Sequence, residues 1–262
     1  MNTSGKYILR ALVALMLCAL ALTQAGAQDR RDLQPEAQQL MLLANQARAA
    51  AGAPPLRWDS ALAEAARKHT LRMVAEGPIA HQYPGELNVS ERAGLAGAHF
   101  DLIEENVAVA PTPTGIHDGW MQSKGHRENM LNPEVDSVGI AVVASRGVLY
   151  ATADYSRGVQ SLTKAQVESR VSNLIQGAGV KVMADHSLAR AACVMDNGMP
   201  RSADTTQPTF IMRWESSDLT RLPKNLVDHL ASRQFREAAI GSCDAHSDDG
   251  TFTSYRVAIL LY

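Results

Sequence analysis

The sequence predicts an α+β protein. Apolar residues recur at helical spacing in two long segments after residue 35, which favours helices there. Two apolar strands, 138–144 and 148–153, are separated by Ser145-Arg146-Gly147, a combination that indicates a hairpin. Long helices followed by paired strands are typical of the α+β class.

The N-terminus has the pattern of a signal peptide. Lys6 and Arg10 form a charged region, the apolar stretch 11–22 follows, and Ala25-Gly26-Ala27 is a small-residue cleavage site. Cleavage is therefore expected before Gln28. The apolar stretch is short for a transmembrane span, although an uncleaved anchor is the alternative. We expect a bacterial protein that is periplasmic or secreted and has no transmembrane anchor after cleavage.

Composition and net charge limit the classes of partner that the protein is expected to bind. The chain of 262 residues allows one or two domains. Its formal net charge is −2 with no run of like charge, which argues against nucleic-acid binding and against a polybasic membrane patch. Outside the signal peptide the cysteines are Cys193 and Cys243, and in an exported protein they most simply form a disulfide. Two separate buried thiols are the alternative.

The first helix is expected to begin at Pro35 and to end at Gly52, with an apolar stripe of Leu40, Leu43, Ala44 and Ala47. Asp59 or Ser60 can cap a second helix that ends at Gly77-Pro78. Its apolar stripe comprises Leu62, Ala65, Ala66, His69 and Met73. Because His69 lies on that stripe, we interpret it as a hydrogen-bonded core histidine and not as a ligand.

The segments that follow are less regular. Residues 79–100 are expected to be irregular, and Pro111 to Gly115 a loop. A helix bearing Trp120 is expected to begin near Asp118 and to end in a polar loop around His126. A histidine on a loop at the mouth of a sheet is a frequent position for chemistry or ligand binding.

Six segments of residues 36–157 together carry a family resemblance. They are Leu42-Leu43-Ala44-Asn45-x-x-Arg48, Pro55-Leu56-x-Trp58-Asp59-x-x-Leu62, His81, Glu105-Asn106-Val107-Ala108, the stretch from Trp120 to Leu131, and the strand pair Val138–Ala141 with Tyr150–Tyr155. In this order they resemble the CAP domain (cysteine-rich secretory proteins, antigen 5, pathogenesis-related class 1, also called SCP-like) in its cysteine-free bacterial form. Glu104 stands where the family motif has glycine.

The resemblance implies a three-layer α-β-α sandwich whose cleft holds two histidines and two acids. His81, Glu105 and His126 match three of these positions, Ser123 stands in place of the fourth, and Asn106 and Asn129 are expected beside them. Two imidazoles and a carboxylate could bind Zn²⁺ or another divalent metal with an open water position. The same groups could instead form a polar network that fixes the loops. Other acids that could replace the missing one, without motif support, are Glu86, Glu104 and Asp136.

Residues 162–262 are expected to form a smaller α+β domain. Ala178–Ala192 parallels Ala51–Ala66 with one gap, and Ala239-Ile240-Gly241 parallels Ser137-Val138-Gly139. Counterparts of the His81 segment and of 124–131 are missing, so the segment reads as a shortened, degenerate CAP-like repeat, or else as an independent domain. The Cys193–Cys243 bridge would tie its second helix to its penultimate strand. The remaining histidines of this half are interpreted as surface or capping residues: His186, His229 and His246.

Three functions are open. The favoured one is a non-enzymatic envelope module whose cleft binds a metal and a lipid or peptide-like ligand, because the second acid is missing and no nucleophile stands out. A metal-dependent hydrolase or peptidase would use Glu105 as its base. A structural or partner-binding protein would have a vestigial cleft. A serine hydrolase built on Ser123 and His126 is disfavoured, because Ser123 lacks the Gly-x-Ser-x-Gly elbow.

Overall fold

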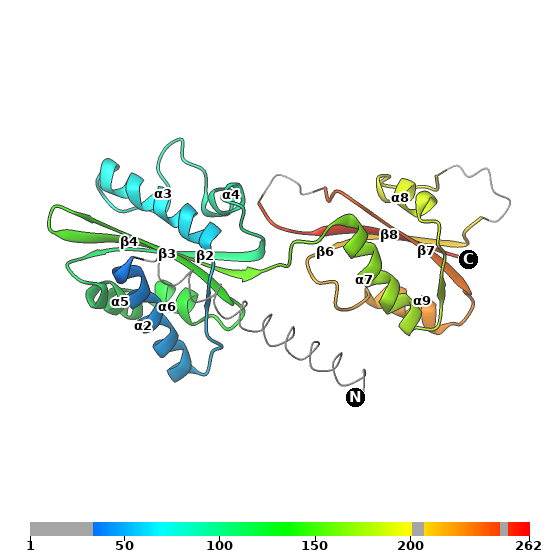
Figure 1. The fold of residues 1–262 in the computed structure, drawn as a ribbon, viewed down its shortest axis with the longest axis horizontal. Helices are drawn as coiled ribbons and strands as arrows, with labels where there is room; N and C mark the ends of the chain where they lie inside the picture. Colours follow the sequence, from blue (N-terminus) through cyan, green and yellow to red (C-terminus); the bar gives the residue numbers. More distant parts are fainter. Residues whose placement is uncertain (1–33, 201–206, 247–250) are drawn as a thin grey trace, which may run out of the picture.

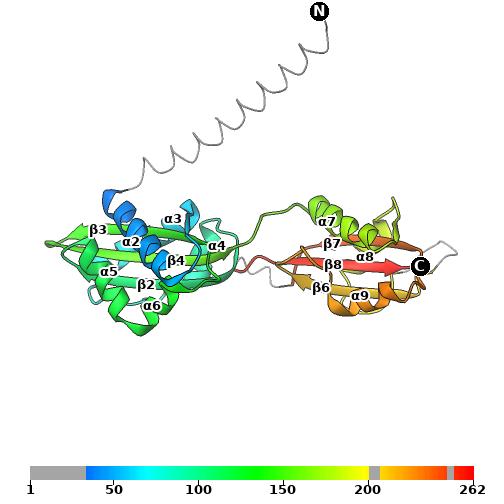
Figure 2. The ribbon, with the colours of Figure 1, turned by 90° about the horizontal axis from the view of Figure 1, so that it is seen from below.

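The computed structural model describes residues 34–200, 207–246 and 251–262. Within them two four-stranded sheets follow each other along the molecule, each flanked by helices, as Figures 1 and 2 show from two directions. The α+β prediction is confirmed. The expected signal peptide and its cleavage site before Gln28 lie outside the described residues. No helix in the described ranges combines the length and apolarity that a membrane crossing requires.

The first domain is a three-layer sandwich. Its elements are α2 (Pro35–Ala51), β1 (Arg57–Trp58), α3 (Ser60–Glu76), α4 (Val89–Leu95), β2 (Phe100–Ala110), α5 (Pro113–Gln122), α6 (Lys124–Leu131), β3 (Ser137–Ser145) and β4 (Val148–Gly158). The strand order is β1-β3-β4-β2, with β1 parallel to β3 and the other pairs antiparallel. Helices α3 and α4 cover one face, and α2, α5 and α6 cover the other (Figure 1). Strand β2 is therefore an edge strand with helices on both sides.

The first two predicted helices are confirmed. Gly52 ends α2 with a φ of 75°, which glycine adopts without steric cost. Asp59 caps α3, where its Oδ1 accepts hydrogen bonds from the N–H groups of Ala61 and Leu62. His69 is fully buried, and its ring nitrogens bond to Glu86 Oε1 at 2.8 Å and to the carbonyl of Ala80 at 2.9 Å. It is a core histidine, as expected.

Three local expectations were wrong. Residues 79–100 contain the helix α4, which Asn88 and Glu91 start with a reciprocal capping box. Helix α5 begins at Pro113 and not near Asp118, because the Thr112 hydroxyl accepts from the Gly115 N–H and proline suits the first helical turn. His126 lies on helix α6 and not in a loop.

Arg48 connects α2 to the segment that carries the second half of the cleft. Its guanidinium is fully buried and donates to four backbone carbonyls at 2.7–2.9 Å. The acceptors belong to Pro54, Met130, Asn132 and Val135. Helix α6 ends at Leu131, so this clamp fixes the C-terminal end of the helix that bears His126.

The second domain has the same strand order as the first. Its elements are α7 (Lys164–Gly177), β5 (Lys181–Val182), α8 (Ser187–Cys193), β6 (Phe210–Ser216), α9 (Lys224–Ala231), β7 (Glu237–Cys243) and β8 (Tyr255–Leu261). The order is β5-β7-β8-β6, with β5 parallel to β7. Val171 on α7 and Leu226 on α9 pack on one face of the sheet, and Ala189 on α8 packs on the other.

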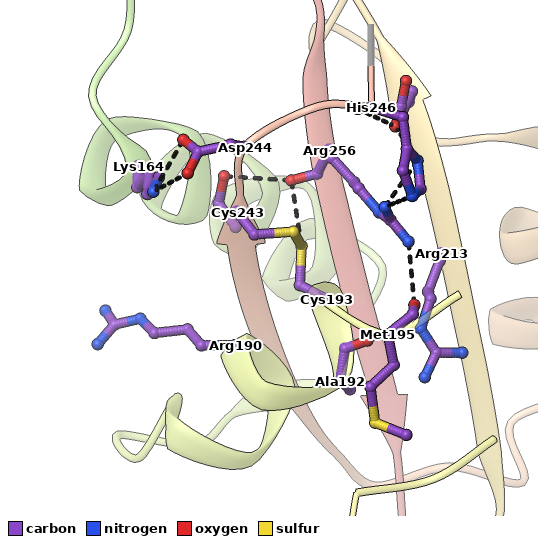
Figure 3. The surroundings of a disulfide bond; sticks show 12 residues. Lys164, Arg190, Ala192, Cys193, Met195, Arg213, Cys243, Asp244, His246 and Arg256 are labelled. Carbon is purple, nitrogen blue, oxygen red and sulfur yellow. Dashed lines mark hydrogen bonds and ion pairs between the residues drawn. A yellow bond between two sulfur atoms is a disulfide. The ribbon is translucent and has the colours of Figure 1, made fainter. Parts of the chain in front are cut away.

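The disulfide between Cys193 and Cys243 is present (Figure 3). It joins the end of α8 to the end of β7, which is the connection expected from the sequence. His246 lies close by and is exposed, as expected, and it has several polar partners. Its ring bonds to Glu215 at 2.8 Å and to Asp196 at 2.7 Å, and it lies beside the guanidinium of Arg256.

Candidate functional site

A polar cleft lies across the open edge of strand β2. Its cavity has a volume of about 470 Å³ and is lined from both helical layers as well as from the strand itself. The lining residues are His81, Gln82, Asn88 and Val89 from the α3–α4 side, Ile103, Glu104 and Glu105 from β2, and Ser123, Gly125, His126 and Asn129 from the α6 side. The structure thus brings together every cleft residue predicted from the sequence except the buried Asn106.

His81 projects into the cleft from the segment between α3 and α4. Its side chain is 57% exposed, and its Nδ1 donates to Glu105 Oε1 at 2.9 Å. The hydrogen bond to Glu105 raises the pKa of His81 above its ordinary value, against the opposing effect of burial. When the ring is neutral, this bond places its proton on Nδ1 and leaves the Nε2 lone pair available.

His126 faces His81 from the opposite layer. The two ring centroids are 6.1 Å apart and the rings are tilted by 51°. Burial lowers the pKa of His126, and the neighbouring charge of His81 lowers it further. The two histidines, 45 positions apart in the sequence, therefore differ in protonation preference although they share one cavity.

Glu105 lies under His81 and has partners for both carboxylate oxygens. Oε1 accepts from His81, and Oε2 accepts a hydrogen bond from the guanidinium of Arg92 on α4. Arg92 also donates to the carbonyl of Leu87 at 2.9 Å and to that of His81 at 3.3 Å. Arg92 was not predicted from the sequence. It fixes both the carboxylate and the backbone of the segment that carries His81.

Asp154 is a second unpredicted member of the site. It lies opposite Glu105 in the β2–β4 register and is fully buried. Neither of its oxygens has a hydrogen-bond partner among the described residues, and the carboxylate of Glu105 is its charged neighbour. Burial raises the pKa of Asp154 well above its ordinary value, and the charge of Glu105 raises it further. Asp154 is therefore favoured in its neutral, protonated form beside Glu105.

Two asparagines hold α6 against the edge of β2. Asn106 Nδ2 donates to the carbonyl of His126 at 2.8 Å. Asn129 Nδ2 donates to Asn106 Oδ1 at 3.0 Å and to the carbonyl of Glu105 at 3.1 Å. The asparagines expected beside the cleft therefore set the position of His126 relative to Glu105.

The place of the missing acid is occupied by Ser123, which lines the cleft at the junction of α5 and α6. Of the substitute acids considered, Glu104 lines the cleft. Its Oε1 accepts from Asn132 at 3.1 Å, and burial raises its pKa. Glu86 bonds to His69, and Asp136 pairs with Arg57, so neither belongs to the cleft.

The arrangement offers two imidazoles to a ligand. In the part of the chain that the structure describes, no group of three or more His, Cys, Asp and Glu side chains is placed to hold a metal ion. His81 and His126 both line the cavity, and Glu104 lines it as well, whereas both carboxylate oxygens of Glu105 are engaged by His81 and Arg92. Such a pair of imidazoles suits a metal that keeps open positions for water or for a ligand.

Comparison with known proteins locates the similarity in the first domain. The model of the cysteine-rich secretory protein family, CAP, matches residues 42–155. The uncharacterized protein YkwD of Bacillus subtilis (strain 168) is 31% identical over 107 residues, which are 40% of this chain and 42% of YkwD. The uncharacterized membrane protein YlbC of the same organism is 28% identical over 106 residues, covering 40% of this chain and 30% of YlbC. The chain thus spans less than half the length of these curated relatives.

Solved structures align over a similar share of the chain. An extracellular protein containing an SCP domain from Bacillus anthracis str. Ames is 27% identical with a TM-score of 0.44, covering 48% of this chain and 44% of the other. An outer surface protein from Borrelia burgdorferi is 17% identical with a TM-score of 0.45, covering 48% of this chain and 96% of the other.

Proposed function

Residues 42–155 belong to the cysteine-rich secretory protein (CAP) family, and from this premise we propose that the protein is a non-enzymatic binding module of the bacterial envelope or extracellular space. Its cleft binds a divalent metal ion through His81 and His126, together with a peptide-like or lipid ligand. The signal-peptide pattern of residues 1–27 supports a periplasmic or secreted location.

The observation that carries the metal site is the pairing of His81 and His126 across the cleft, with ring centroids 6.1 Å apart. Glu105 bonds to Nδ1 of His81, which is the carboxylate–histidine arrangement found behind metal-ligating imidazoles. The lowered pKa of His126 favours the neutral ring that a metal requires. These residues fit Zn²⁺, for which imidazole nitrogen is a preferred ligand. The ion would supply a Lewis-acidic point for a donor atom of the ligand.

Binding is favoured over catalysis by the state of the carboxylates. A hydrolase would need Glu105 as general base, but its oxygens are held by Arg92 and His81. Asp154 is inaccessible to solvent, and Ser123 makes no hydrogen bond to His126 within residues 34–200. Arg92 and His81 therefore hold Glu105 in place, and a proton-transfer mechanism would require Glu105 to be released from them.

Zinc titration of the purified mature protein by calorimetry tests this function. We expect one zinc ion per chain at neutral pH, and loss of measurable binding in His81→Ala and in His126→Ala. The matched control is His229→Ala, because His229 is exposed on α9 in the second domain. Absence of stoichiometric zinc in the wild type, or unchanged binding in both cleft variants, would exclude the metal site. Zinc-dependent cleavage of envelope peptides that is abolished by Glu105→Gln would instead establish an enzyme.

A further inference from the structure

The outer edge of β2 presents main-chain groups in an alternating pattern. The carbonyls of Glu105 and Val107 accept hydrogen bonds from side chains outside the sheet, Asn129 Nδ2 and Trp120 Nε1. In an antiparallel strand the N–H and C=O of one residue point to the same side, and alternate residues share that side. Ile103, two residues before Glu105, therefore also points its N–H and C=O away from β4.

The helices cover this edge only in part. At Val107 and at the Glu105 carbonyl it is closed by Trp120 and Asn129. Ile103 and Glu105 both line the cleft, and no described residue outside the sheet accepts a hydrogen bond from the Glu105 N–H. Among the described residues, neither the N–H nor the C=O of Ile103 has a hydrogen-bond partner outside the sheet. A short stretch of strand edge without outward hydrogen-bond partners thus belongs to residues that line a cavity.

The cleft lining distinguishes between the two ligand classes considered above. Its aliphatic side chains are Val89 and Ile103, and the other lining residues apart from Gly125 carry amide, hydroxyl, imidazole or carboxyl groups. An acyl chain would bury little apolar surface here and would desolvate the polar groups without bonding to them. A peptide main chain would supply both a donor and an acceptor at each residue.

We propose that the ligand of this cleft is an extended peptide segment that pairs as an added strand with the β2 edge at Ile103 and Glu105. The inference rests on the proposed binding function and narrows it to one ligand class. The paired stretch spans roughly 7 Å of strand, so a few peptide residues occupy the cleft. Main-chain pairing supplies the affinity, and His81 and His126 lie where they can contact a side chain or a metal-bridged donor of the peptide.

The test uses the full mature protein and a synthetic library of linear heptapeptides, with affinity of the best binder measured by fluorescence anisotropy. On the protein side, Ile103→Pro removes the outward N–H without removing a bond to β4, whereas Ile103→Ala removes only the side chain, which packs partly against the α3–α4 core. We expect binding to Ile103→Pro to be about tenfold weaker than to Ile103→Ala, the loss of a main-chain hydrogen bond. Val109→Pro, on the same edge but outside the cleft, should leave peptide affinity unchanged.

On the ligand side, the best peptide is resynthesised in two versions. One version carries N-methyl groups on the odd-numbered residues and the other on the even-numbered residues, and these are the two phases compared. One phase should lose about tenfold in affinity and the other should not, because only alternate N–H groups face β2. Equal effects of the two phases, or equal affinities of Ile103→Pro and Ile103→Ala, would overturn strand pairing. If no peptide binds but a fluorescent palmitate probe does, the ligand class is wrong. Zinc titration of the same variants separates these outcomes from failure of the metal site.

Discussion

At the scale of single residues, the two cleft histidines have opposite electrostatic surroundings. His81 has the carboxylate of Glu105 at 2.9 Å, whereas burial dominates at His126. Both rings have the same ordinary pKa of 6.5. As the pH falls, the metal-free protein therefore takes up a proton at His81 first and at His126 later.

Proton NMR titration of the metal-free protein checks this order. We expect the pKa of His81 to lie above 6.5 and that of His126 below it. In Glu105→Gln the pKa of His81 should fall, because the charged acceptor is lost while the opposing effect of burial stays. Glu128→Gln, an exposed change on α6, should leave it unchanged. A higher pKa for His126 than for His81 would contradict the geometry.

Arg48 is expected to contribute strongly to stability because its guanidinium is buried. Replacing it with Met leaves four carbonyl groups without their donor, so we expect Arg48→Met to lower the free energy of unfolding by on the order of 3–5 kcal/mol. Arg57→Met serves as the control: that side chain is 73% exposed and forms a surface ion pair with Asp136, so the expected cost is at most about 1 kcal/mol. Urea denaturation measures both, and similar costs for the two variants would refute the clamp.

At the scale of elements, the helices lie unusually close to the sheet at one glycine in each domain. A Cβ at Gly139 on β3 would lie 2.0 Å from the backbone N of Ala63 on α3. A Cβ at Gly241 on β7 would lie 2.2 Å from the backbone N of Arg190 on α8. Both contacts are with backbone, which cannot move aside as a flexible side chain could.

We therefore expect Gly139→Ala to destabilise the first domain by about 3 kcal/mol or more, because α3 must shift away from the sheet. Gly119→Ala in α5 is the matched change: nothing lies within 4 Å of its Cβ, and alanine should stabilise the helix by about 0.5–1 kcal/mol. Thermal unfolding followed by circular dichroism compares the two. A neutral Gly139→Ala would mean that the helix is not held this close to the strand.

The helices and strands also show which structural features local sequence patterns can predict. Helices α2 and α3 and the β3–β4 hairpin follow from apolar spacing, the Asp59 cap and the turn residues. The apolar pattern does not indicate helix α4, although Asn88 and Glu91 form a capping box, because the helix has only seven residues. The polar residues around His126 indicate a loop, whereas the segment forms a short helix that tertiary hydrogen bonds from Asn106 and Arg48 hold in place.

At the scale of the whole molecule, the second domain has the sheet order of the first without its site. Gly241 and Arg213 both lie opposite Ala258, as Gly139 and Glu105 both lie opposite Asp154. Arg213 thus stands in the position of Glu105, and it donates to the carbonyls of Ala192 and Gly198. That residues 162–262 descend from a degenerate copy of the first domain stays a prediction, with which this correspondence agrees.

The disulfide should act on the second domain alone. Cys193 and Cys243 are separated by 50 positions, and both lie in that domain. Replacing both with Ala should cost about 3–4 kcal/mol, because the unfolded chain is no longer cross-linked. Hydrogen-exchange mass spectrometry should show faster exchange in residues 164–262 and unchanged protection of α3 and β3. Equal loss of protection in both domains would show that they unfold as one unit.

The sequence by itself determined the fold class, the two long helices, the hairpin, the pairing of Cys193 with Cys243, and the identity of His81, Glu105 and His126 as cleft residues. Apolar periodicity, helix-capping residues and the spacing of family motifs are local features of the sequence, so they can be recognised without a structure. The tertiary structure alone decided that the cleft crosses the edge of β2 and that Arg92 and Asp154 complete it. No local sequence pattern around Arg92 or Asp154 indicates that Glu105 is its neighbour. Their proximity and burial arise only when α4 and β4 pack beside β2.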